Sequence, residues 1–361
     1  INRWLGGPGE FYITRLSRDF KDFDTYRVDV ETLSLTPVIK EHFNKFLDSR
    51  NMRLTDGRDG DIIYWSEADG WAHLYRYDRN GDLVNRITEG PWHVDEIVGV
   101  DSASETVYFV ANGREEGINP YYEFLYSVKF DGTGLKLLTP GDADHKITML
   151  GDNRYFIDNA SRVDMAPESV LYRADGKKIM ELEKADLSKL FESGYRFPER
   201  FTVKAADGIT DLYGVMYTPY DLDTTRLYPI IEYVYPGPQQ EGVQYSYMEP
   251  RGTLDRLAQL GFIVVTVGNR GGHPARSKWY HTYGYGDLRD YGLADKKTAA
   301  IQLADRYPFM DITRVGITGH SGGGFMSTAA ILKYPEFFKV AVSCAGNHDN
   351  AIYNRMWGEK Y

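Results

Sequence analysis

The chain has 361 residues, enough for about two domains, and its 42% hydrophobic and 26% charged residues are ordinary for a globular protein with a buried core. The net charge of −10 argues against nucleic acid as a partner, because phosphate binding needs a basic surface. No apolar run approaches the ~18 residues of a membrane span. The one cysteine, Cys344, excludes an intrachain disulfide, and its apolar neighbours predict that it is buried.

The chain opens at Ile1, without a leader sequence, close to a run that is typical of a strand. We therefore expect both ends to be cut. For the same reason, the absence of targeting signals does not identify a compartment.

Residues 1–182 are predicted to be β-rich. Short runs of alternating apolar residues are separated by turn dipeptides such as Asp69-Gly70 and Asn80-Gly81. An aromatic strand, a turn, a Leu-Tyr strand and a closing strand recur in 65–86, 109–138 and 155–180. A spacing of roughly 40–45 residues is typical of propeller blades, so we predict the C-terminal part of a β-propeller with about four blades. A β-sandwich is the alternative.

Residues 183–195 are predicted to form a linker helix. From 196 to 361, apolar strands alternate with helices, which indicates a doubly wound, mostly parallel sheet. The helices are expected at 252–260, 290–306 and 324–334, and strands without polar alternation are expected at 229–235 and 261–267. We predict the N-terminal part of an α/β-hydrolase domain.

The most specific motif is Gly319-His320-Ser321-Gly322-Gly323, which follows an apolar strand and precedes a predicted helix. A Gly-x-Ser-x-Gly sequence in this context predicts a nucleophile elbow, in which the serine lies on a strained strand-to-helix turn. The serine would attack a carbonyl group, and the resulting oxyanion needs hydrogen-bond donors. The backbone N–H of Gly322 is one candidate donor. The hydroxyl of Tyr235, at the end of an earlier strand, is the second, although Tyr235 as simple packing stays open.

Taken together, several motifs resemble the prolyl oligopeptidase family of serine peptidases, and most closely its dipeptidyl peptidase IV branch. They are Tyr235 with Gly237-Pro238, the run 268–272, the run 283–287 with Asp290, and the run 319–325. The resemblance implies a β-propeller before a hydrolase domain, a peptide substrate and no cofactor. It also implies that Ser321 is the nucleophile and that Tyr235 and the Gly322 N–H form the oxyanion hole.

The same resemblance makes 347–361 the wall of the pocket that selects a proline-sized residue. Its paired aromatics correspond to Tyr353 and Trp357, four apart and so on one face of a helix. The branch usually has tyrosine at both positions, so Trp357 puts a strict proline preference in doubt. Both rings as core residues is the alternative.

Two parts of the expected machinery are missing. The triad Asp and His of this fold follow the serine on later strands, and the chain ends just beyond one further strand. His320 neighbours Ser321 and points elsewhere, while His348 and Asp349 lie in the wrong order. We therefore expect no working triad, no hydrolysis and no phosphonate labelling of the chain as given, with His348 the first suspect if labelling occurs.

The branch also holds the substrate's amino terminus with an acidic pair on the propeller. Glu115-Glu116 is one candidate, but a solvated loop is the simpler interpretation, and the family's pair is expected upstream of residue 1. No spacing of His, Cys and carboxylates predicts a metal site. The run 268–272 is not a dinucleotide motif, and the resemblance links Arg270 to the Asp287 segment structurally.

The leading hypothesis is a serine peptidase that forms an acyl-enzyme on Ser321 and releases dipeptides, with small or proline residues before the cut. An acyl-peptide hydrolase or esterase is the runner-up. A non-catalytic propeller protein that binds partners is the hypothesis from another class. The resemblance implies a periplasmic or secreted protein, and the oligomeric state stays open, with a homodimer as one option.

Overall fold

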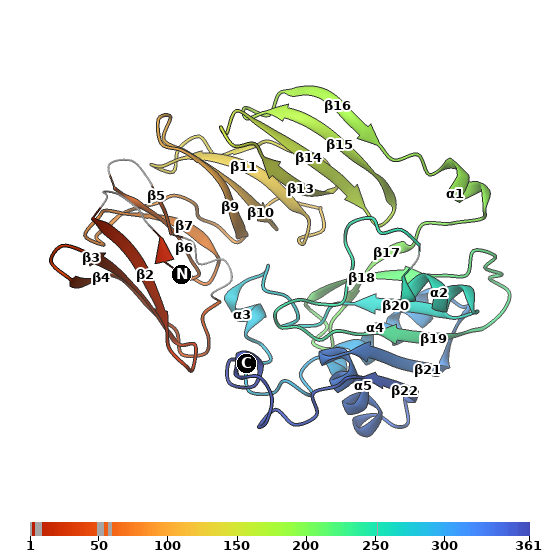
Figure 1. Ribbon diagram of the computed structural model, residues 1–361. Coiled ribbons are helices and arrows are strands. Elements are labelled where there is room, and N and C mark those ends of the chain that lie inside the picture. Colours follow the sequence, from red (N-terminus) through yellow and green to blue (C-terminus); the bar gives the residue numbers. More distant parts are fainter. Residues whose placement is uncertain (1, 4–8, 49–53, 57–59, 251) are drawn as a thin grey trace.

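The computed structural model describes residues 2–3, 9–48, 54–56, 60–250 and 252–361. In this part of the chain, four antiparallel four-stranded sheets come first, and a six-stranded mixed sheet with its helices follows (Figure 1). The four sheets follow one another along an arc that lies over the six-stranded sheet (Figure 1). None of the sheets formed by the described residues is closed on itself.

In each antiparallel sheet the four strands are neighbours in chain order. The first sheet contains β1 (Asn2–Arg3), β2 (Glu10–Leu16), β3 (Asp22–Asp29) and β4 (Ser34–His42). The second contains β5 (Leu54–Asp56), β6 (Ile62–Ser66), β7 (His73–Tyr77) and β8 (Leu83–Arg86). The third contains β9 (His93–Asp101), β10 (Thr106–Asn112), β11 (Glu123–Lys129) and β12 (Lys136–Leu137). The fourth contains β13 (Asp144–Met149), β14 (Tyr155–Arg162), β15 (Met165–Arg173) and β16 (Lys178–Lys184).

Aromatic residues fill the space between neighbouring sheets. Trp65 of β6 donates from Nε1 to the Val94 carbonyl of β9 at 2.7 Å, and its ring lies edge-on to His93 of β9 with ring centroids 6.2 Å apart. Every residue of β6 and β10 is buried, so these two strands pack on both faces. Trp65, one of the aromatic strand endings that suggested a repeat, therefore joins the second sheet to the third.

The six-stranded sheet has the order β17-β18-β20-β19-β21-β22. It contains β17 (Glu199–Lys204), β18 (Asp211–Tyr217), β19 (Tyr228–Tyr233), β20 (Ile263–Val267), β21 (Met310–His320) and β22 (Phe338–Cys344). The last four strands in this order pair in parallel, and β17 and β18 form an antiparallel hairpin at the edge.

Helices cover the sheet on both faces. They are α2 (Thr253–Gln259), α4 (Leu293–Arg306) and α5 (Gly322–Lys333), while the short helices α3 (Lys278–His281) and α6 (Arg355–Gly358) lie in loops between the sheet and the antiparallel sheets. Ile263 and Val265 of β20 belong to the core that α4 and α5 complete, whereas Val264 packs on the side of α2. Such two-sided burial explains the unbroken apolar run that predicted this strand.

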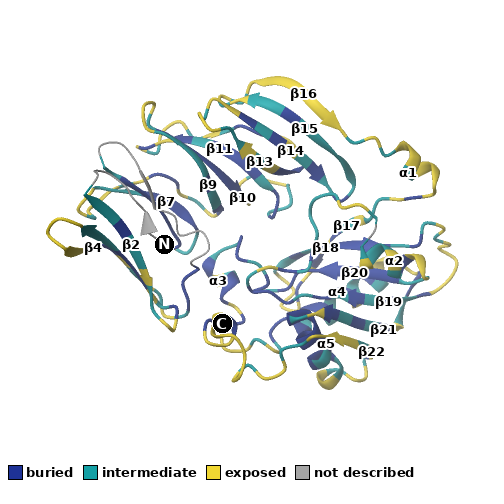
Figure 2. Cartoon of the chain, in the orientation of Figure 1, coloured by how far each residue is buried: buried dark blue, intermediate teal, exposed yellow. Residues whose placement is uncertain are grey.

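The predicted linker helix is wrong in its first part. Glu183 and Lys184 belong to β16, where they pair with Ser169 and Glu168 of β15. Only α1 (Ser188–Glu192) is helical. β16 is exposed along its whole length (Figure 2). Its charged residues are typical of a solvent-exposed helix, which is why a helix was predicted, but they form an edge strand.

The predicted burial of Cys344 is also wrong, because its side chain is exposed. Within the described part of the chain, β22 pairs only with β21, so one edge and one face of this strand stay open. Val340 and Val342 are exposed there for the same reason. Apolar composition alone did not distinguish an edge strand from a central one.

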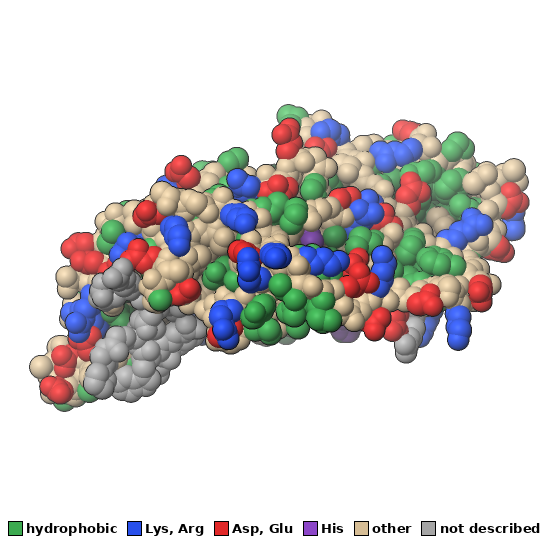
Figure 3. Space-filling view, turned by 90° about the horizontal axis from the view of Figure 1, so that it is seen from above, with side chains coloured by type: hydrophobic (Ala, Val, Ile, Leu, Met, Phe, Trp, Pro, Cys, Tyr) green, Lys and Arg blue, Asp and Glu red, His purple; other side chains and the backbone are tan. Residues whose placement is uncertain are grey.

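The surface mixes both signs of charge. Seen from above, Lys and Arg side chains alternate with Asp and Glu side chains over the visible face (Figure 3). None of the helices in the described residues has the length and hydropathy needed to span a bilayer.

Candidate active site

Ser321 lies at the tightest turn of the six-stranded sheet. β21 ends at His320 and α5 begins at Gly322, so Ser321 alone joins the strand to the helix. Its φ of 57° is in the left-handed region, which a residue with a side chain adopts at a cost of roughly 1–3 kcal/mol. The Ser321 N–H donates to the Cys344 carbonyl at 2.8 Å, which ties the turn to β22. The predicted strand, turn and helix around Ser321 are confirmed.

Glycines around Ser321 are required by backbone contacts. A Cβ atom at Gly319 would lie 2.3 Å from the Val234 carbonyl oxygen, and one at Gly323 would lie 2.1 Å from the same atom. A Cβ at Gly324 would lie 2.5 Å from the Cys344 carbonyl oxygen. No real contact is this short, so each position admits only glycine without a shift of the main chain. The motif thus lets β19, the turn and α5 approach one another closely.

A cavity of about 290 Å³ opens beside Ser321. Its lining includes Tyr235, Gly322, Tyr353 and Trp357, which are the other candidate residues from the sequence. The ring of Tyr235 reaches Gly322, since a Cβ there would lie 3.5 Å from Tyr235 Cζ. The structure therefore brings together all five candidate residues at one cavity.

Gln239 adds a contact that the sequence did not reveal. Its Nε2 donates to the Tyr235 hydroxyl at 2.8 Å. Because that hydrogen bond uses a lone pair of the phenolic oxygen, the Tyr235 proton stays available for another acceptor. Gln239 lines the same cavity, which supports a polar role for the hydroxyl rather than packing of the ring alone.

The loop after Tyr235 is held by side chains from distant parts of the chain. The Pro236 carbonyl accepts hydrogen bonds from Asn269 Nδ2, at 3.1 Å, and from the Tyr291 hydroxyl. The Pro238 carbonyl lies 2.9 Å from His281 Nε2. Sequence reasoning missed these three supports because no local pattern links them to the loop. Of the three, only Asn269 lies in a run that the sequence singled out, the Gly-rich run 268–272.

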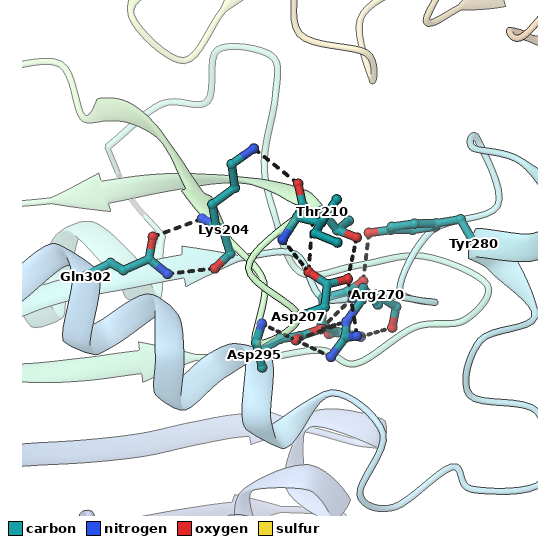
Figure 4. Close-up of polar contacts among 10 residues, drawn as sticks. Lys204, Asp207, Thr210, Arg270, Tyr280, Asp295 and Gln302 are labelled. Atoms are coloured by element: carbon teal, nitrogen blue, oxygen red, sulfur yellow. Dashed lines mark hydrogen bonds and ion pairs between the residues drawn. The ribbon is translucent and has the colours of Figure 1, made fainter.

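Arg270 fixes the next loop (Figure 4). Its guanidinium contacts the fully buried Asp295 at 2.9 Å and Asp207 at 3.3 Å, and it lies over the Tyr283 ring at 4.5 Å. Hydrogen bonding, chiefly from the Thr210 N–H, lowers the pKa of Asp207 to about 2. The expected structural link from Arg270 to the Asp287 segment is present through the Tyr283 ring, and the ion pair with Asp295 of α4 adds a partner that was not expected.

Tyr353 and Trp357 share the cavity but not a helix. α6 begins at Arg355 because Asn354 has extended backbone angles and its side chain accepts from the Met356 N–H at 2.8 Å. Tyr353 precedes this cap and is 46% exposed, whereas Trp357 is 8% exposed and packs with Phe20. The i,i+4 argument was wrong, and the two rings converge because the loop folds back over Ser321.

The remaining candidates lie elsewhere. His348 Nε2 is 3.5 Å from Ser343 Oγ and its ring faces Phe325, and the Asp349 carboxylate accepts from the Ala351 N–H. No described side chain hydrogen-bonds to the Ser321 hydroxyl. Glu115 accepts from Tyr126 at 2.8 Å and pairs with Arg114, and neither it nor Glu116 lines this cavity. Among the residues described, no three His, Cys, Asp or Glu side chains are grouped to hold a metal ion.

Comparisons with known proteins agree with this architecture. Residues 2–167 match the family model described as the dipeptidyl peptidase IV N-terminal region, and residues 251–361 match that of the prolyl oligopeptidase family. The chain is 28% identical to dipeptidyl peptidase 8 of Homo sapiens over 288 residues, which is 76% of this chain and 31% of that protein. It is 26% identical to dipeptidyl peptidase 4 of Trichophyton rubrum over 312 residues, 82% of this chain and 38% of that protein.

Two solved structures are similar over the whole chain. The dipeptidyl peptidase 4 of Porphyromonas gingivalis has a TM-score of 0.88 at 26% identity, covering 100% of this chain and 50% of that one. A putative dipeptidyl aminopeptidase IV from Bacteroides ovatus has a TM-score of 0.86 at 26% identity, covering 100% of this chain and 53% of that one. The chain thus spans about a third to a half of the length of the relatives it matches.

Proposed function

Because the chain belongs to the dipeptidyl peptidase IV-like branch of the prolyl oligopeptidase family, we propose that it forms part of a serine dipeptidyl aminopeptidase. The two family models match its two halves in the order that a propeller followed by a hydrolase domain requires. We assign the four sheets that end with β16 at Lys184 to propeller blades, 185–195 with α1 to the linker, and 196–361 to the N-terminal part of an α/β-hydrolase domain. The four four-stranded sheets and the six-stranded mixed sheet support this division.

In the proposed reaction, Ser321 Oγ attacks the carbonyl carbon of the peptide bond. The carbonyl oxygen becomes an oxyanion, which accepts hydrogen bonds from the Gly322 N–H and the Tyr235 hydroxyl. Collapse of this intermediate breaks the C–N bond, and the proton lost by the Ser321 hydroxyl ends on the departing amine; water then hydrolyses the acyl-enzyme, which releases the acid and restores the hydroxyl. None of the described histidines contacts Ser321 Oγ, so the proposal assigns no general base within the described residues.

Tyr353 and Trp357 are proposed to receive the side chain before the cut. Trp357 is fixed by its packing on the first sheet, whereas Tyr353 is half exposed and free to adjust. A flat, rigid indole and a movable phenol suit a small or cyclic apolar residue better than a long one.

One observation carries the proposal: the strained Ser321 turn opens on a cavity whose wall holds Tyr235 and Gly322 side by side. The test compares chromogenic Xaa-Pro dipeptide amides with short p-nitrophenyl esters as substrates for the complete protein. The proposal expects amide hydrolysis that requires a free amino terminus. Hydrolysis of esters or N-acylated peptides alone would favour an esterase or acyl-peptide hydrolase, and no hydrolysis would favour a binding protein.

A further inference from the structure

A second cavity, also of about 290 Å³, lies away from Ser321, where the segment after α1 meets the six-stranded sheet. Its walls come from several parts of the chain. They include Tyr195 before β17, Tyr217 at the end of β18, Tyr233 at the end of β19 and Asp255 in α2. It shares no lining residue with the cavity at Ser321, so the proposed peptidase chemistry does not account for it.

Two tyrosines of this cavity are deeply buried without hydrogen-bond partners for their hydroxyls. Tyr195 is 4% exposed and Tyr217 is 7% exposed. No described residue hydrogen-bonds to either phenolic oxygen, and neither oxygen is among the fully buried polar atoms, so both hydroxyls are open to the cavity. Burial raises the pKa of both phenols well above 10, so both hydroxyls keep their protons. Each is left with a free donor and a free acceptor at the wall of a cavity.

Asp255 supplies a negative charge to the same space. Its carboxylate makes no ion pair or hydrogen bond with another described side chain, and partial burial raises its pKa. Asp255 and Tyr217 line the same cavity, and after burial the charge of Asp255 is the next cause that raises the pKa of Tyr217. A half-buried carboxylate without a counter-ion favours a cation and disfavours an anion.

Three tyrosine rings line the cavity, and further aromatic rings pack behind Tyr195. Tyr195 contacts Phe191, Phe197 and Tyr220, with ring centroids 5.8, 5.6 and 5.5 Å apart. Such rings attract a cation through their faces and also cover an alkyl chain. The lining thus includes phenol groups and the carboxylates of Asp255 and Glu249, which is a set of groups that a protonated amine can satisfy.

We propose that this cavity, defined by Tyr195, Tyr217, Tyr233 and Asp255, binds a small primary alkylammonium ion. The ammonium group donates hydrogen bonds to the Asp255 carboxylate and to the phenolic oxygens, and the alkyl chain lies against the rings. A quaternary ammonium lacks N–H donors, so it would leave the acceptors unpaired. A neutral alcohol would leave the carboxylate without a counter-charge. The site is independent of the assignment of Ser321.

The test is a calorimetric titration of the complete protein with n-butylammonium chloride, at constant ionic strength. We expect saturable binding, with at least about tenfold weaker binding of tetramethylammonium and of n-butanol. Equal binding of either probe would overturn the proposal, as would the absence of saturable binding of n-butylammonium. Titration with free arginine separates guanidinium from alkylammonium recognition, and tighter binding of arginine would also overturn the stated ligand class.

Variants assign the binding to this cavity. Asp255→Asn is expected to weaken n-butylammonium binding about tenfold or more, and Tyr217→Phe is expected to weaken it less, because one neutral acceptor is lost. Asp305→Asn, which removes a carboxylate from α4 outside the cavity, is the control and should bind like the wild type. If Asp255→Asn does not fold, Tyr195→Phe tests the same wall. Wild-type affinity in a folded Asp255→Asn or Tyr195→Phe protein would overturn the site.

Discussion

Ser321 and Tyr235 meet because β21 and β19 are neighbours and run in parallel, which brings their carboxyl ends to the same edge of the sheet. The sequence predicted each residue separately, from a motif in one case and from a strand ending in the other. Their proximity depends on the strand order, which no local pattern contained. At the scale of the residue, the proposed chemistry therefore depends on the hydroxyls of Ser321 and Tyr235 and on the Gly322 N–H, which lie at the same edge of the six-stranded sheet.

Tyr235→Phe is the most direct change to the proposed oxyanion hole. It removes one oxygen and keeps the ring, so packing should survive while the donor to the developing charge is lost. We expect kcat to fall by about 10²–10³ and KM to change little, because the bond forms in the transition state. Steady-state kinetics of the complete enzyme give both values. A kcat within about threefold of wild type, under about 1 kcal/mol, would reject this role.

Gly323→Ala tests the close approach of β19 to the turn. The new methyl group would meet the Val234 carbonyl oxygen at 2.1 Å, so the main chain must move and the nucleophile moves with it. We expect a loss of about 1–3 kcal/mol in the free energy of unfolding and a large loss of activity. Gly151→Ala is the control, since a Cβ there meets nothing within 4 Å. Equal stability and activity of the two variants would refute the steric argument.

At the scale of elements, α3 connects the second sheet to the loop after Tyr235. Lys278 Nζ contacts the Glu67 carboxylate at 2.6 Å, and both side chains are 3% exposed. Lys278 also lies about 5 Å from the ring centres of Phe43 and Phe46. His281, on the same helix, contacts the Pro238 carbonyl. One short helix thus joins a buried ion pair at one end to the proposed oxyanion loop at the other.

Glu67→Gln should destabilise the protein by about 3–5 kcal/mol, because it leaves the Lys278 ammonium buried without a counter-charge. The control is Glu336→Gln, which breaks the exposed pair with Lys297 and should cost under about 1 kcal/mol. Urea unfolding measures both. Adding Lys278→Met to Glu67→Gln should recover much of the lost stability, since no charge then stays buried. An unchanged free energy of unfolding in Glu67→Gln would show that water reaches the Lys278–Glu67 ion pair.

Elements with strong local signals were predicted well, and those set by context were not. The apolar run of β20 and the glycines around Ser321 specify their local structure by themselves, so the strand and the turn could be predicted from the sequence. β16 and α6 depend on what surrounds them: β16 is a charged edge strand held by pairing with β15, and the start of α6 is fixed by the Asn354 cap. The supports of the 235–238 loop come from residues far apart in sequence, which composition and periodicity do not connect.

At the scale of the whole molecule, buried acidic groups link stability to pH. Burial, the largest cause, raises the pKa of Glu241 from near 4.5 to about 7. The folded state therefore holds a proton on Glu241 that the unfolded state releases, and the free energy of unfolding falls as pH rises from about 4.5 to 7.

Glu241→Gln should remove this contribution, which reaches about 3 kcal/mol for a pKa difference of this size. Urea unfolding of wild type and variant between pH 5 and 7.5 measures it, a range above the titration of the carboxyls whose pKa is lowered, such as Asp207. We expect a shallower decline of stability in the variant. Identical slopes would mean that Glu241 is ionised in the folded protein.

The central claim is that Ser321 is the nucleophile of a serine peptidase, and labelling by a fluorophosphonate tests it most directly. The reagent forms a covalent bond only with an activated serine hydroxyl. We predict that the complete protein takes up one equivalent of label on Ser321 and that Ser321→Ala, with unchanged thermal unfolding, takes up none. Label on the Ser321→Ala protein, or a folded wild-type protein that takes up no label, would contradict the account.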